Sequence, residues 1–337
     1  MLKHLEKSIY LTTLCLSFLL PVLSANVKVI RIPEKIKIEE NVFKETFVAD
    51  LSKQEIFSPS GLHICDGKIF FFKMNKPHDL VVMDLNGKIQ KKIARYGAGP
   101  CEVRFAWGVL KHKEKYIVND FKGMKLIFFD KNLKCLDEFK VKNGSWDNCI
   151  NNKNEIILGG GNLGLPYFHI YSLSGDFRRS FGKPQIKPDE YKKEGRLDYV
   201  KGMVYIPKKD GIWACFCNRY DLKYYEHEKL KIEINAKPDF FKIKKKKYQG
   251  YTMRLPVSYP IIIKRVNNHI LYIYKMEGKI CFCDVFDINS YRLKRRIKLN
   301  KSYRKFFGYH KDGIFYALFE DEEKESLNLY KLEFPLK

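Results

Sequence analysis

The feature that most constrains this chain is a β-hairpin pattern that recurs along its length. Each occurrence has an apolar run, a short polar turn and a second apolar run, as expected for two antiparallel strands. Turn pairs such as Asp66-Gly67 and Asp312-Gly313 are typical of tight hairpins. The six occurrences span residues 62–72, 108–118, 149–158, 203–215, 261–273 and 307–318.

A second hairpin follows most of these repeats. It is clear at residues 81–93, 126–139 and 169–181, and weaker versions span 222–234 and 280–297. The unit is therefore four antiparallel strands, and turn-to-turn spacings of about 40 to 58 residues are typical of propeller blades. A stack of β-sandwiches is the alternative, which the regular turn spacing disfavours.

The sixth unit ends at its third strand, residues 327–332, whereas a propeller must close its ring. The segment 42–51 precedes the first unit, and we predict that it supplies the missing strand. The predicted fold is therefore all-β: one six-bladed β-propeller of four-stranded antiparallel blades over residues 26–337, closed by an N-terminal strand.

Residues 1–25 have the pattern of a secretory signal peptide. Lys3 and Lys7 precede an apolar run at 9–20, and Leu-Ser-Ala at 23–25 predicts cleavage near residues 24–25. An uncleaved anchor and a core helix are the alternatives. We expect an exported protein, in the periplasm or at the cell surface, with no transmembrane segment in the mature chain.

The composition narrows the class of protein. Of 337 residues, 45% are hydrophobic and 30% are charged, which excludes disordered, collagen-like and multi-span membrane proteins. Aromatic residues make up 15% and favour β structure. Lys and Arg outnumber Asp and Glu by 63 to 39, so the formal charge is +24, which favours anionic partners unless it reflects composition alone.

The segment 79–102 carries a family resemblance. It contains a strand ending in Asp84, an Asn-Gly turn, a basic strand and then Arg-Tyr-Gly-Ala-Gly-Pro-Cys-Glu. It resembles the exported six-bladed NHL-like and TolB-like β-propeller proteins of bacterial cell envelopes, although Met83, Cys101 and Val103 depart from their usual pattern. The resemblance implies a six-bladed propeller and implies little about chemistry, because most members have no assigned activity.

The glycine-rich part of this segment is expected to be a corner between blades. Gly97 and Gly99 would allow positive φ angles, Pro100 would fix the next turn, and Glu102 could cap neighbouring backbone N–H groups. A phosphate-cradling loop is the alternative, but no Gly-x-Gly-x-x-Gly pattern opens a helix here.

Cys215-Phe216-Cys217 and Cys281-Phe282-Cys283 are the most suggestive cysteine pairs. Residues i and i+2 of a strand face the same side, so two pairs could in principle hold a metal. The spacing is not that of a zinc knuckle, and free buried cysteines are the favoured interpretation, with disulfides and a metal as alternatives.

A ligand site is predicted at one mouth of the channel, where the second strands of successive units end. A ring of Asn and Asp there could take a hard cation such as Ca²⁺; the alternative is that these side chains satisfy turns. We name no catalytic residue, no metal ligand and no other cofactor. The candidate mouth residues are Asn75, Asp120, Asn162 and Asn218, with Arg219 and Tyr220 beside the last.

Two basic runs form a candidate polyanion patch. A solvated surface is the alternative, and nucleic acid is not expected because no nucleic-acid motif accompanies the runs. The residues are Lys244, Lys245, Lys246, Lys247, Arg292, Arg295 and Arg296.

These observations favour a non-catalytic binding or scaffolding protein of the bacterial cell envelope. We expect a monomer with a protein or glycan ligand at one end of the channel. One alternative is a metal-dependent propeller hydrolase or lyase of the lactonase type. Another is a protein that binds polyanions or acidic glycans.

Overall fold

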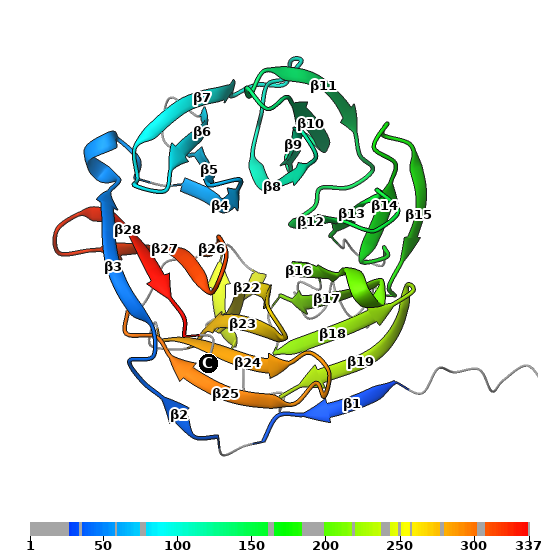
Figure 1. Ribbon diagram of the computed structural model, residues 1–337, viewed down its shortest axis with the longest axis vertical. Helices are drawn as coiled ribbons and strands as arrows, with labels where there is room; N and C mark the ends of the chain where they lie inside the picture. Colours follow the sequence, from blue (N-terminus) through cyan, green and yellow to red (C-terminus); the bar gives the residue numbers. More distant parts are fainter. Residues whose placement is uncertain are drawn as a thin grey trace, which may run out of the picture.

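The six predicted hairpins form the inner halves of six blades arranged around a central channel (Figure 1). The computed structural model describes residues 27–33, 36–57, 59–74, 79–160, 165–183, 199–217, 220–236, 243–248, 251–256, 258–276, 280–301 and 307–335. The predicted signal peptide lies outside the described residues. The all-β, six-bladed fold is confirmed.

Each of blades 1 to 3 is a four-stranded antiparallel meander whose strands follow one another from the channel outward. Blade 1 contains β4 (Pro59–Cys65), β5 (Lys68–Lys73), β6 (Asp79–Asp84) and β7 (Ile89–Arg95). Blade 2 contains β8 (Ala106–His112), β9 (Lys115–Asp120), β10 (Lys125–Phe129) and β11 (Cys135–Lys140). Blade 3 contains β12 (Asp147–Ile150), β13 (Ile156–Gly159), β14 (Phe168–Tyr171) and β15 (Phe177–Phe181).

Blades 4 and 5 repeat this plan, and a separate hairpin lies between them in the chain. Blade 4 contains β16 (Val200–Ile206), β17 (Gly211–Phe216), β18 (Asp221–Glu226) and β19 (Lys229–Asn235). Blade 5 contains β22 (Tyr259–Val266), β23 (His269–Lys275), β24 (Cys281–Asp287) and β25 (Leu293–Lys298). The hairpin, which the sequence pattern did not predict, pairs β20 (Ile243–Tyr248) with β21 (Tyr251–Pro256). Short 3-10 turns cover Ser52–Gln54 and Pro207–Lys209.

The ring closes as predicted. Blade 6 takes β26 (Phe307–Tyr309), β27 (Ile314–Asp321) and β28 (Ser326–Glu333) from the C-terminal end of the chain. Its outermost strand is β3 (Lys44–Asp50), which pairs antiparallel with β28. The last blade is thus built from both ends of the chain.

Two blades carry a fifth strand that was not predicted. β1 (Lys28–Arg31) pairs parallel with β19, and β2 (Ile38–Glu39) pairs parallel with β25. β1 and β2, together called the strap below, therefore lie on the outer edges of blades 4 and 5 (Figure 1). These strands are too short to show a period of two in the sequence.

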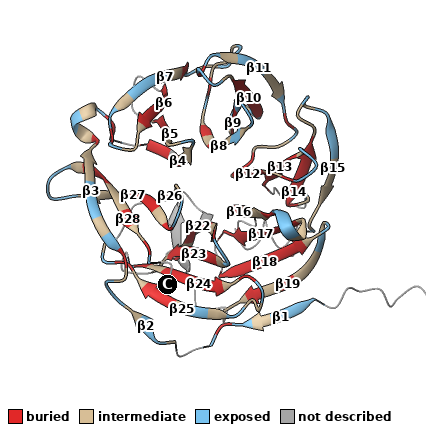
Figure 2. Ribbon diagram, in the orientation of Figure 1, coloured by how far each residue is buried: buried red, intermediate tan, exposed pale blue. Residues whose placement is uncertain are grey.

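The apolar core lies between neighbouring blades. Phe70 and Phe72 of blade 1, for example, pack with Tyr116 and Val118 of blade 2. The middle strands are covered on both faces and are continuous apolar runs, whereas the outer strands mix exposed and partly buried residues (Figure 2). Among the described residues, no helix has the length and apolar character needed to cross a membrane.

Candidate functional site: the central channel

The chain direction gives the channel two different ends. Every inner strand starts where the chain crosses from the preceding blade and finishes at a short hairpin turn. The crossovers and the links between second and third strands therefore share one end, called the crossover end. The tight turns lie at the other end, called the turn end.

A cavity of about 770 Å³ occupies the channel. All six inner strands line it, with apolar side chains such as Leu62, Val109 and Ile262 along its walls. Its volume falls in the range of about 300–1,000 Å³ that is typical of small-molecule sites.

Aromatic rings gather at the crossover end, where three inner strands begin. Phe105 stacks on Trp107, with ring centroids 5.4 Å apart, and Tyr199 stacks on Trp146 at 4.9 Å. The two tryptophans meet edge to face at 4.8 Å. These four residues, called the mouth cluster, all line the cavity. They offer flat apolar surfaces to a ligand.

Lys201 lies against this cluster. Its ammonium is 4.7 Å from the ring centroid of Trp107 and 4.9 Å from that of Trp146. Both distances are within the range of a cation–π interaction. A positive charge is thus held at the aromatic end of the cavity.

Asp120 stabilises the backbone of the crossover that carries Phe105 of the mouth cluster. Its carboxylate is fully buried and accepts the backbone N–H groups of Arg104 at 3.0 Å, Phe105 at 2.8 Å and Gly123 at 3.0 Å. The N–H of Phe121 in turn donates to the carbonyl of Phe105 at 2.9 Å. Asp120 was predicted as a mouth ligand; the structure uses its oxygens to fix the crossover that carries Phe105.

The other charged side chains of the cavity wall have different surroundings. Lys111 pairs with Asp66 at 2.7 Å. The carboxylate of Asp147 accepts the backbone N–H of Met203 at 2.8 Å. Lys264, on β22, has neither a hydrogen bond nor an ion pair with any of the described residues.

His63 stands in the cavity wall on β4. Its Nε2 is hydrogen-bonded to the carbonyl oxygen of Trp107. The pKa of His63 is lowered to about 4, mainly by burial; the charge of Asp147 opposes this shift, and the charge of Lys264 adds to it. The ring is therefore neutral at pH 7, with the proton on Nε2 and Nδ1 left as an acceptor.

For the other predicted mouth residues, the structure places only Tyr220, and the prediction for the rest is untested. Asn75, Asn162, Asn218 and Arg219 lie outside the described residues. Tyr220 is buried between blades 4 and 5, where its hydroxyl bonds Asp284. No group of three or more His, Cys, Asp or Glu side chains in the described part of the chain is placed to hold a metal.

The residues of the predicted polyanion patch have different surroundings in the structure. Arg296 is only 6% exposed and makes a two-pronged ion pair with Asp284 at 2.6 and 2.7 Å. Arg295 pairs with Glu39 of the strap at 2.6 Å, whereas Arg292 is exposed. Burial therefore removes Arg296 from any surface patch. The backbone of Lys244, Lys245, Lys246 and Lys247 forms part of β20.

The glycine-rich segment lies between blades 1 and 2. Glu102 accepts the N–H of Gly99 at 2.8 Å, and a Cβ on Gly97 would lie 1.9 Å from the Glu102 carboxylate. Neither glycine has positive φ, so the expected reason for them was wrong: the carboxylate of Glu102 lies in the space that a side chain at position 97 would take. Within this segment the residue with positive φ, 60°, is Cys101.

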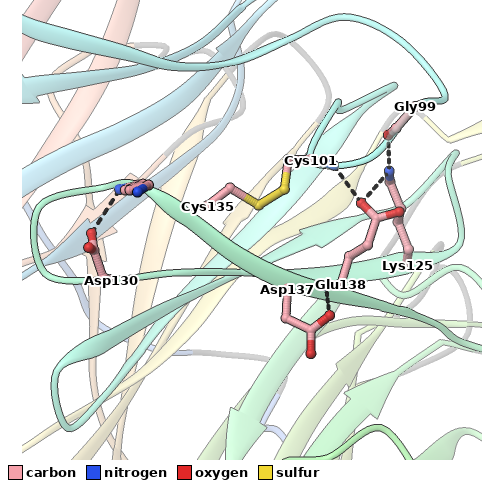
Figure 3. Close-up of a disulfide and its surroundings, with 8 residues drawn as sticks. Gly99, Cys101, Lys125, Asp130, Cys135, Asp137 and Glu138 are labelled. Carbon is pink, nitrogen blue, oxygen red and sulfur yellow. Dashed lines mark hydrogen bonds and ion pairs between the residues drawn. A yellow bond between two sulfur atoms is a disulfide. The ribbon is translucent and has the colours of Figure 1, made fainter.

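A disulfide and several hydrogen bonds link this glycine-rich corner to blade 2. Cys101 forms a disulfide with Cys135 of β11. Glu138 accepts the N–H of Cys101 and the ammonium of Lys125, both at 2.8 Å, and Lys125 also donates to the Gly99 carbonyl at 2.9 Å (Figure 3). Pro100 lies within the fastened turn. The favoured interpretation of Cys215, Cys217, Cys281 and Cys283 agrees with the structure: all four are buried, and none forms a disulfide with a cysteine of the described residues.

Sequence reasoning missed Trp107, Trp146, Lys201 and Lys264. One signal was present: Trp107 and Trp146 both stand near the starts of inner strands, in blades 2 and 3. Aligning the repeats on these starts would have brought the two tryptophans together at one end of the channel.

Comparison with known proteins gives the fold and no more. No protein family matches the chain, and no curated protein matches its sequence. A protein of Bacteroides fragilis, provisionally assigned as exported, superposes with a TM-score of 0.61 at 10% identity, covering 92% of this chain and 100% of that one. A DUF4221-family protein of Bacteroides vulgatus gives 0.59 at 13%, covering 88% and 99%.

A third similar structure is an enzyme. Virginiamycin B lyase from Staphylococcus aureus gives a TM-score of 0.53 at 10% identity, covering 87% of this chain and 100% of that one. At these identities the likeness extends to the fold alone.

Proposed function

We propose that this protein is an exported, monomeric, ligand-binding β-propeller of the bacterial cell envelope that holds a small molecule in its central channel without transforming it. The observation that carries the proposal is the cavity of about 770 Å³, whose crossover end is formed by the mouth cluster. Flat aromatic rings on one side and apolar strand residues on the other suit a ligand with an apolar body.

Export is proposed on two grounds. The N-terminal sequence has the pattern of a signal peptide, and the Cys101–Cys135 disulfide suits an oxidising compartment. N-terminal sequencing of protein secreted by the native host tests this: the mature chain should begin near Asn26. An intact N-terminus on the exported protein would contradict cleavage.

No reaction is derived from the likeness to a lyase, which is one of fold. His63 has the acceptor nitrogen that a base needs, but Lys264 beside it and the aromatic rings suit ligand binding equally. Binding without a reaction requires only the cavity, whereas catalysis would also require reactive groups placed around a substrate.

The binding proposal is tested with a neutral fluorescent probe, N-phenyl-1-naphthylamine, whose emission rises in apolar surroundings. We expect saturable binding to a single site. Ile262→Trp would fill part of the cavity and weaken binding by about tenfold or more. Leu136→Trp is the matched control, because Leu136 is 49% exposed on β11, away from the channel.

Both variants should show the far-ultraviolet circular dichroism spectrum of the wild type. Equal probe affinity in the wild type and both variants would show that the probe binds elsewhere, and the proposal would fail.

A further inference from the structure

We propose that the channel selects ligands that join a flat apolar body to one anionic group, with the body against the mouth cluster and the anionic group at Lys264. The inference rests on the proposed function and names the ligand class for that site. It identifies Lys264 as the residue that determines the charge of the ligand.

The charges of the cavity wall favour an anion. The charged side chains among its described lining residues are Lys111, Lys201, Lys264 and Asp147. The Asp147 carboxylate already accepts the backbone N–H groups of Met203 and Asn148, each at 2.8 Å. The described lining residues therefore have a net positive charge, and the Asp147 carboxylate among them already accepts two backbone N–H groups.

Lys264 is the cation best placed to bind an incoming charge. Lys111 is neutralised by Asp66 at 2.7 Å, and the Lys201 ammonium lies over two indole rings. Lys264 makes no ion pair with a described residue, although it stands in a partly enclosed wall where a charge is weakly screened. An anionic ligand group inside the cavity would pair with this ammonium.

The two ends of the cavity fit one ligand. The mouth cluster lies at the crossover end, where β8, β12 and β16 begin. Lys264 lies toward the turn end of β22. His63 links the two regions: its ring bonds the Trp107 carbonyl, and the charge of Lys264 lowers the pKa of that ring. A ligand lying along the wall would reach from the rings to the ammonium, with His63 Nδ1 available to accept a hydrogen bond.

A matched pair of probes distinguishes the contribution of the anionic group to binding from that of the apolar body. 1-Anilinonaphthalene-8-sulfonate is N-phenyl-1-naphthylamine with a sulfonate added. We expect the wild type to bind the sulfonate about tenfold or more tightly than the neutral probe. Lys264→Met should abolish that difference and leave the neutral probe unaffected, and Lys264→Arg should retain it.

Lys131→Met is the control for net charge, because Lys131 is exposed in the turn between β10 and β11. It should leave the difference unchanged. The preference should also persist at 0.3 M salt, since a charge within the cavity is screened less than one on the surface. Equal loss in Lys131→Met and Lys264→Met would mean that overall charge attracts the probe.

His63 supplies a second readout that a merely structural lysine would not change. The pKa of its imidazole, followed by NMR, should rise when the sulfonate binds near Lys264 and stay unchanged with the neutral probe. Neutral-probe binding without any preference for the sulfonate would overturn this inference and leave the proposed function standing. If the protein bound neither probe, both this inference and the proposed function would be overturned.

Discussion

The protonation of His63, a single residue in the channel wall, affects the stability of the fold. His63 is neutral in the folded protein because burial holds the pKa of its imidazole at about 4 rather than 6.5. Unfolding frees the ring to take up a proton wherever the pH is below 6.5. The unfolded state therefore gains protons relative to the folded one between about pH 6.5 and pH 4.

The free energy of unfolding should consequently fall as the pH is lowered through this window, by up to roughly 3 kcal/mol from this residue. Urea unfolding of the wild type and His63→Gln from pH 7 to pH 4 measures it. The variant keeps a donor for the Trp107 carbonyl and should show a shallower decline. Parallel curves would contradict a buried neutral His63.

Asp120 should matter more for stability than an aspartate in an ordinary turn. Asp120→Asn replaces a buried acceptor of three backbone N–H groups with a group that is half donor, and we expect a loss of about 2–3 kcal/mol. Asp130→Asn is the control: Asp130 also accepts two backbone N–H groups, from Asn132 and Lys134, but in an exposed turn. Equal effects in urea unfolding would contradict the role given to burial.

Elements at the N-terminus have two separable roles. β3 completes blade 6, whereas the strap only covers the edges of blades 4 and 5. A chain beginning at Asn41 should fold with the same circular dichroism spectrum and a lower Tm, since it loses the buried Ile32 and the Glu39–Arg295 pair. A chain beginning at Leu51 should fail to form a stable ring. Similar Tm values for the two truncations would contradict this division.

The Cys101–Cys135 disulfide fastens one crossover to the outer strand of the next blade, closing a loop of sequence separation 34. The double variant Cys101→Ser/Cys135→Ser should lose roughly 3 kcal/mol through greater freedom of the unfolded chain. Dithiothreitol should lower the Tm of the wild type to a similar extent and leave the double variant unchanged. A wild-type Tm insensitive to reductant, with the bond shown to be reduced, would contradict this contribution.

At the scale of the whole molecule, the propeller ring was predictable because the same hairpin pattern recurs in the sequence of every blade. Six copies of one hairpin pattern fix the blade count, and the missing strand of the last repeat points to closure by residues 42–51. The strap was not predictable, because strands of four and two residues pair in parallel at outer edges and leave no alternating pattern.

The site was harder to predict than the ring. The channel wall is assembled from six strands that lie far apart in the sequence, so Trp107, Trp146 and Lys264 share no motif. Asp120 and Tyr220 were singled out as polar residues after strands, yet the fold uses both inside: Asp120 holds backbone N–H groups and Tyr220 bonds a buried carboxylate. Sequence position alone does not separate a ligand-facing side chain from one that satisfies its own loop.

The most direct measurement is a crystal structure of the protein with 1-anilinonaphthalene-8-sulfonate. We predict that the probe binds inside the channel, with its rings against Trp107 and Trp146 and its sulfonate within about 3 Å of the Lys264 ammonium. A probe bound only on the outer surface, with the channel unchanged, would contradict the central claim that this propeller binds its ligand in the channel.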